Sequence, residues 1–183
     1  TLDITGGDAG HKLAILAGLA FGARVSPEEI PTEGIDSVDP RDIRYARKFG
    51  YAIRPLAIAE RVSEEALDLR VHPGLVPIGH PLAHVEGALN AVAIESAMVG
   101  PSFLSGPGAG AGPTATRVAG DIMDIAKNAL ASAPVRTRSL GANGALRIQP
   151  ITDLRSRYYL RFSVRDQSGV LAALSGALGD AGI

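Results

Sequence analysis

The sequence predicts an α/β fold of the α+β kind, in which a mixed β-sheet is covered by helices. Two observations lead to this prediction. Some stretches repeat apolar residues every three or four positions, as helices do, whereas others alternate with the period of two that is typical of strands. The chain has 183 residues, of which 46% are hydrophobic, and this suffices for one well-cored domain with some remainder.

The first part of the chain predicts two helices. Apolar residues at helical spacing predict the first over residues 8–21, with Gly22 as its natural stop. Asp39 followed by Pro40 is a typical helix start, and the second helix is expected to continue as far as Phe49.

The middle of the chain is expected to be rich in strands. The stretch 90–98 is apolar enough for a buried strand or a helix, and a strand is the preferred interpretation. The remaining expected elements are strands over 51–62, 67–72 and 103–104, a helix over 114–130, an aperiodic linker or crossing segment over 132–157, a strand over 159–164 and a helix over 169–178.

Composition excludes several classes of function. The formal net charge is −1, so the chain lacks the basic face that nucleic acid or an anionic membrane would need. There are no cysteines, which excludes disulfides and thiolate chemistry and fits a reducing cytoplasm. No apolar run approaches the roughly 20 residues of a membrane span. Because the sequence begins inside a motif, we expect it to be a fragment of a longer protein.

The first motif is the stretch from Thr1 to Leu13, TLDITGGDAGHKL. Asp8 and Lys12 are four residues apart and share a face of the predicted helix, a spacing that usually indicates a surface ion pair. Asp3 lies just ahead, across a glycine turn that could bring it close. A lysine beside a carboxylate can also transfer a proton, so a functional site is the alternative interpretation.

The second motif is a glycine-rich turn, GPGAGAG, between Gly106 and Gly112. It matches the dinucleotide fingerprint only formally, because no acidic residue follows about 20 positions later. Glycines ahead of a helix let backbone N–H groups approach a ligand closely, whereas a flexible hinge is the other interpretation. His80 and His84 have a spacing that metal ligands use, but Pro81 between them favours a structural role.

Together these stretches resemble homoserine dehydrogenase. DITGGDAGHKLAILA, from Asp3, looks like the substrate motif of that family, and HPLAHVEGALNAV and GPGAGAGPTATRVAGDI look like two further blocks. The resemblance implies a catalytic and dimerisation domain over 1–135 and a linker over 136–157. Residues 158–183 resemble the start of an ACT domain, an amino-acid-sensing module, through the DxxGVL stretch from Asp166.

The resemblance also implies roles for single residues. Lys12 would be the catalytic acid/base, while Asp8 and Asp3 would bind the substrate. Cofactor-binding residues, implied in the same way, are Gly106, Gly108 and Gly110. No metal ligand is expected.

The implied reaction is the reversible oxidation of L-homoserine to L-aspartate 4-semialdehyde with NAD or NADP, in threonine, methionine and isoleucine biosynthesis. The implied assembly is a cytoplasmic homodimer that binds neither nucleic acid nor membrane. Most of the cofactor would be held by a nucleotide-binding domain outside this chain. Two alternatives remain: a dimerisation and substrate-recognition fragment without activity of its own, and an amino-acid-binding regulatory module.

Overall fold

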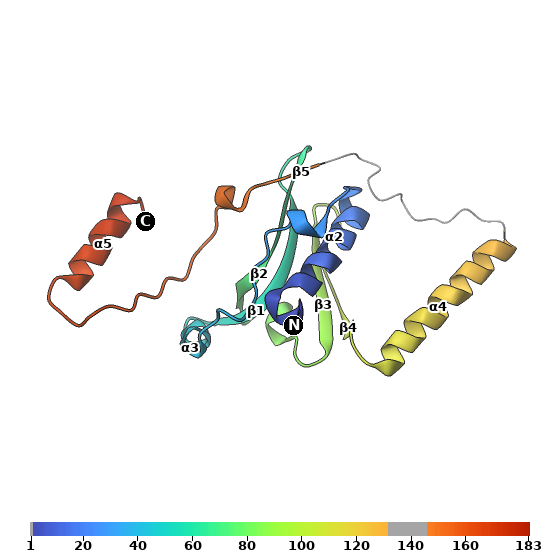
Figure 1. Ribbon diagram of the computed structural model, residues 1–183, viewed down its shortest axis with the longest axis horizontal. Helices are drawn as coiled ribbons and strands as arrows, with labels where there is room; N and C mark the ends of the chain where they lie inside the picture. Colours follow the sequence, from blue (N-terminus) through green and yellow to red (C-terminus); the bar gives the residue numbers. More distant parts are fainter. Residues whose placement is uncertain (1, 132–145) are drawn as a thin grey trace.

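The computed structural model describes residues 2–131 and 146–183. In chain order, the elements are α1 (Leu2–Thr5), α2 (Gly7–Phe21), η1 (Pro27–Glu29), α3 (Pro40–Lys48), β1 (Tyr51–Arg61), β2 (Ala66–Pro77), η2 (Pro81–His84), β3 (Leu89–Ser96), β4 (Gly100–Pro107), α4 (Ala111–Leu130), β5 (Arg147–Ile148), η3 (Ile151–Asp153) and α5 (Val170–Asp180). Helix α2 lies against the long β1–β2 hairpin, while α4 and α5 extend in opposite directions from this body (Figure 1).

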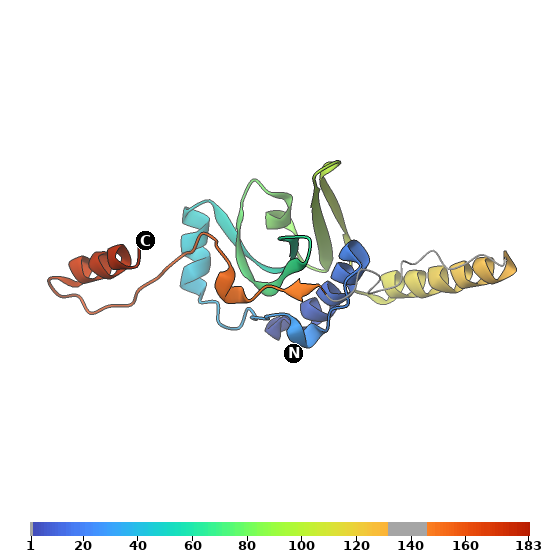
Figure 2. The same ribbon diagram turned by 90° about the horizontal axis from the view of Figure 1, so that it is seen from above.

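The strands of the described ranges form two sheets. In the first, β1 pairs antiparallel with β2 and β5 adds to β2 in parallel, which makes the sheet mixed. In the second, β3 and β4 form a separate antiparallel hairpin. The predicted mixed sheet with helical cover is therefore confirmed, although the strands are divided between two sheets. Figure 2 shows the curvature of the first hairpin and α2 beside it.

The core lies between α2 and one face of β2. Successive side chains of a strand point to opposite faces, so Leu67, Leu69 and Val71 share one face of β2. They are almost wholly buried and form one cluster with Leu13 and Ala17 of α2. This packing fixes α2 on the sheet, and therefore fixes the residues that its first turns carry.

Most predicted elements are present. Helix α2 ends where expected, with Gly22 in the left-handed conformation that favours glycine. Helix α3 starts at the expected cap, where the Asp39 side chain accepts a hydrogen bond from the Arg41 N–H at 2.8 Å. Residues 90–98 do form a strand over most of their length, β3. The strand expected at 103–104 is longer, and α4 begins three residues before the expected start.

The prediction of a strand over 159–164 is wrong. This segment carries no strand pairing within the described residues, because no neighbouring strand supplies the hydrogen-bond partners that a sheet requires. It runs as an extended chain past α3 and leads to α5 (Figure 1). The predicted linker lies partly outside the described residues, since 132–145 are not among them; its described part contains β5 and η3.

Helix α4 has a different environment from α2. None of its residues is buried, and its apolar side chains Val118, Ile122 and Ile125 are all more than half exposed. Among the described residues, no helix is long and apolar enough to cross a membrane.

Candidate functional site

The predicted catalytic and substrate-binding residues lie at the corner between α1 and α2. Asp3 belongs to the short helix α1, and Asp8 lies in the first turn of α2. Gly6 joins the two helices with φ 83°, a left-handed conformation that strains other residues. A carboxylate in the first turn of a helix is favourable because the N–H groups there are partly positive. The corner therefore places one carboxylate on each side of a glycine turn.

Asp8 and Lys12 form an ion pair along one face of α2. Lys12 Nζ lies 2.6 Å from Asp8 Oδ2, so the predicted sharing of a helix face is confirmed. The side chains are open to solvent, with exposed fractions of 58% for Lys12 and 44% for Asp8. Leu13 beside them is buried in the core. The backbone under the pair is thus firmly held, while its charged ends remain accessible to a ligand.

The glycine-rich turn connects β4 to α4. Gly106 lies in β4, and Gly110 precedes the first turn of α4 with φ 119°. Gly108 donates its N–H to the Ala88 carbonyl at 3.0 Å. A Cβ atom added at Gly108 would overlap the side chain of Asn90, so a side chain fits there only if Asn90 moves. The turn therefore presents bare backbone directly ahead of a helix N-terminus, where N–H groups lack partners within the helix.

The structure does not bring the glycine turn to the α1–α2 corner. The two views show the start of α4 and the N-terminal corner lying apart from each other (Figures 1 and 2). Residues 2–131 and 146–183 thus contain two separate parts of the predicted site.

The histidines make structural contacts. His80 accepts a hydrogen bond from the Leu82 N–H at 3.1 Å, and His84 Nε2 lies 2.7 Å from the Ile78 carbonyl oxygen. Both contacts hold the turn around η2, which agrees with the structural interpretation. In the described part of the chain, no group of three or more acidic or histidine side chains could hold a metal ion.

A cluster that the sequence did not indicate joins α3 to the C-terminal segment. Asp42 accepts hydrogen bonds from Tyr159 Oη at 3.0 Å and from the Arg161 guanidinium, which also reaches Asp39 at 3.3 Å. The hydrogen bond from Arg161 lowers the pKa of Asp42 below its ordinary value of 3.8. The partners are about 120 positions apart in the sequence, which explains why local patterns could not reveal them.

Comparisons with known proteins agree with this architecture. The family model described as "Homoserine dehydrogenase" matches residues 1–123. The homoserine dehydrogenase of Neisseria gonorrhoeae is 40% identical over 182 residues, which cover 97% of this chain and 42% of the relative. That of Corynebacterium glutamicum is 38% identical over 187 residues, covering 100% of this chain and 42% of the relative.

Solved structures show the same likeness. A homoserine dehydrogenase from Thiobacillus denitrificans superposes with a TM-score of 0.82 at 37% identity, covering 98% of this chain and 42% of that one. A hyperthermophilic archaeal homoserine dehydrogenase mutant in complex with NADPH gives a TM-score of 0.53 at 30% identity, covering 72% and 35%. The chain therefore belongs to the homoserine dehydrogenase family. The chain spans 42% of the length of the relatives from Neisseria gonorrhoeae and Corynebacterium glutamicum.

Proposed function

We propose that this chain is the substrate-binding and catalytic part of an enzyme that interconverts L-homoserine and L-aspartate 4-semialdehyde. The observation that carries the proposal is the accessible Asp8–Lys12 ion pair, with Asp3 across the glycine turn. Membership of the family supports it, because the family model covers all three residues.

Lys12 moves the proton in this proposal. When the alcohol is oxidised, Lys12 accepts the proton of the substrate's C4 hydroxyl group. In the reverse direction, the ammonium returns a proton to the carbonyl oxygen. General acid–base groups of this kind contribute roughly 10²–10⁴-fold to a rate. The exposed fraction of Lys12, 58%, leaves its Nζ free to reach a bound substrate.

Asp3 and Asp8 bind the other end of the substrate. Homoserine carries an ammonium group, and carboxylates are its natural partners through charge-assisted hydrogen bonds. Asp8 also holds Lys12 at 2.6 Å, so it orients the proton-transfer group while it contacts the substrate.

NAD or NADP would supply the hydride acceptor when bound. The turn at Gly106, Gly108 and Gly110 fits one end of such a cofactor, because glycines let a ligand approach the backbone closely and the turn leads into a helix N-terminus. These residues would line the nicotinamide end of the cofactor without placing side chains against it. The nucleotide end would be held by protein beyond this chain.

The direct test is a steady-state assay of the full-length enzyme with L-homoserine and either NAD or NADP. We expect oxidation of L-homoserine and much weaker turnover of 4-hydroxybutyrate, which lacks the ammonium group. Equal turnover of both compounds would contradict the roles of Asp3 and Asp8, and absence of turnover would contradict the function.

The β3–β4 hairpin supports a second candidate, a homodimer interface. A two-stranded hairpin is marginally stable in water by itself, and this one exposes apolar side chains, among them Ile94 at 50% and Leu104 at 59%. Neither outer edge of the hairpin pairs with another strand of the described ranges, so both offer backbone groups to a partner. Sedimentation at increasing concentration tests this proposal, and a strict monomer would contradict it.

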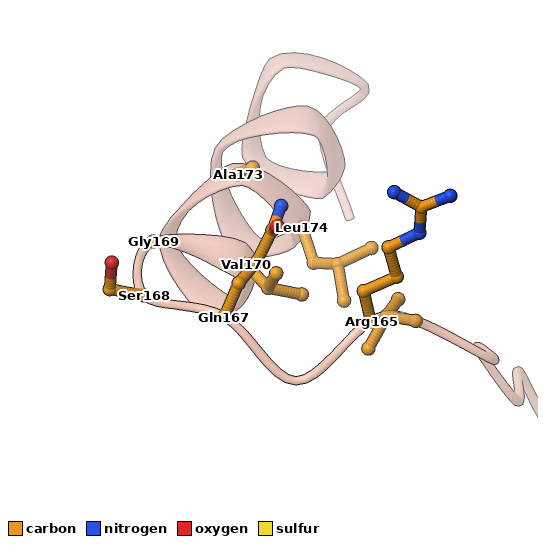
Figure 3. A pocket seen from close by; sticks show the side chains of 8 residues that line it. Arg165, Gln167, Ser168, Gly169, Val170, Ala173 and Leu174 are labelled. Carbon is orange, nitrogen blue, oxygen red and sulfur yellow. The ribbon is translucent and has the colours of Figure 1, made fainter.

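A third candidate, amino-acid binding by the C-terminal segment, is favoured by a shallow cavity of about 550 Å³ at the start of α5 (Figure 3). Its lining includes Arg165, Gly169 and Leu174, close to the DxxGVL stretch. Calorimetry with threonine tests this role, and absence of heat would refute it.

A further inference from the structure

The segment from Pro31 to Ile35 connects the α1–α2 corner to the core strand β2. Along one side, Val71 donates its N–H to the Pro31 carbonyl at 2.9 Å, and Glu33 donates to the Val71 carbonyl at 2.8 Å. On its other side, Ile35 donates its N–H to the Ile4 carbonyl of α1 at 2.9 Å. Because Val71 is buried, the segment is fixed to the core and holds α1 from there.

Gly34 allows this close approach. A Cβ atom at Gly34 would lie 2.3 Å from the Ile4 carbonyl oxygen and 2.8 Å from the Thr5 Cα atom. Both are backbone atoms of α1, so a side chain at position 34 would force α1 and this segment apart. The spacing between this segment and α1 is therefore set by the absence of a side chain at one position.

Helix α1 is not stabilised by burial of its own side chains. It is only four residues long and none of its side chains is buried; Leu2 and Ile4 are 65% and 45% exposed. A single helical turn is not stable by its own hydrogen bonds. The bond from Ile35 and the close contact at Gly34 are thus two restraints that tie α1 to the core, beside its link to α2 through Gly6.

On the same segment, Thr32 lies beneath the start of α2. A Cβ atom at Gly6 would meet Thr32 Cγ2 at 2.9 Å, and one at Gly10 would lie 3.5 Å from Thr32 Oγ1. One segment therefore touches both sides of the corner, the side that carries Asp3 and the side that carries the Asp8–Lys12 pair.

We propose that Gly34 is a positioning residue that sets where α1 places Asp3 relative to Asp8 and Lys12. The inference rests on the proposed function, because it assigns Gly34 a task in substrate binding. A shift of α1 by even one ångström would move the Asp3 carboxylate away from the substrate's ammonium group while Lys12, held on α2, stays in place.

The test is Gly34→Ala in the full-length enzyme, with Gly79→Ala as the matched control. Gly79 has no atom within 4 Å of an added Cβ, so the same chemical change meets open space there. We expect Gly34→Ala to raise the KM for L-homoserine at least tenfold while kcat changes less than threefold, and Gly79→Ala to leave both unchanged. A normal KM in Gly34→Ala would overturn the proposal.

A double variant separates positioning from general damage. If Gly34 acts through Asp3, then Gly34→Ala adds little to the KM defect of Asp3→Asn, because the contact that it disturbs is already lost. Multiplying defects would show that Gly34 acts by another route. Failure of the proposed function would appear differently, as a wild-type enzyme that does not turn over L-homoserine.

Amide hydrogen exchange tests the geometry without any substitution, and keeps the proposal open to refutation should Gly34→Ala fail to fold. In the wild-type chain, the Ile35 amide is expected to be protected to a degree similar to that of Glu33, since both are hydrogen-bonded. An Ile35 amide that exchanges as fast as an unstructured peptide would overturn the proposal.

Discussion

Replacing Leu67 by alanine tests whether the α2–β2 core stabilises the fold that carries the site without taking part in the reaction. Leu67 is 0% exposed and lies in the cluster that joins β2 to α2. Its truncation removes buried methyl groups and leaves a cavity, at a cost of about 3 kcal/mol of unfolding free energy. For a domain of this size, that cost lowers the Tm by roughly 10 °C.

Urea unfolding followed by circular dichroism measures this loss, with Leu130→Ala as the matched control. Leu130 ends α4 and is 88% exposed, so the same chemical change there should cost less than about 0.5 kcal/mol. In the full-length enzyme, kcat per folded molecule should stay at the wild-type value. Equal stability losses for the two variants would refute the placement of the core.

Three further predictions concern the C-terminal cluster and the glycines. The hydrogen bond from Arg161 lowers the pKa of Asp42, so the contribution of this carboxylate to holding the C-terminal segment is complete above pH 3.8 and is lost as the pH falls through the lowered value. Hydrogen exchange against pH, compared with an unstructured peptide, should show this loss, and Asp42→Asn should weaken the dependence, since Asp39 still contacts Arg161. Gly6→Ala should destabilise the chain by about 1–2 kcal/mol more than Gly50→Ala, since both glycines have positive φ but only Gly6 lacks space for a Cβ; equal losses in urea unfolding would contradict the close approach. Gly108→Ala should raise the KM for NAD(P) several-fold while the KM for L-homoserine stays normal, and the reverse pattern in steady-state kinetics would contradict its role.

Much of the fold could be predicted from periodicity because helices and strands impose their own repeat on the sequence. Helix α2 was predicted close to its observed bounds in this way, whereas periodicity left the stretch of β3 open to strand or helix. The failure at 159–164 has a physical reason: alternation shows that a segment could form a strand, but pairing depends on a neighbour that the segment itself does not encode. Here the same residues attach through Tyr159 and Arg161 to α3.

The candidate site was only partly readable from the sequence. The spacing of Asp8 and Lys12 predicts their ion pair, because residues four apart meet on a helix. Spacing could not show how open the pair is to solvent. Nor could it show the contact of Gly34 with α1, which joins positions about 30 residues apart. The only local signal there was a glycine in a loop, which many turns would explain equally well.

The central claim is that Lys12 transfers the proton, and the most direct measurement is the kcat/KM of Lys12→Ala in the full-length enzyme with L-homoserine. We predict a fall of about 10²–10⁴-fold with an unchanged Tm, and partial recovery of the rate when a small primary amine is added in solution. A rate near that of the wild type, in a variant that folds normally, would contradict the account.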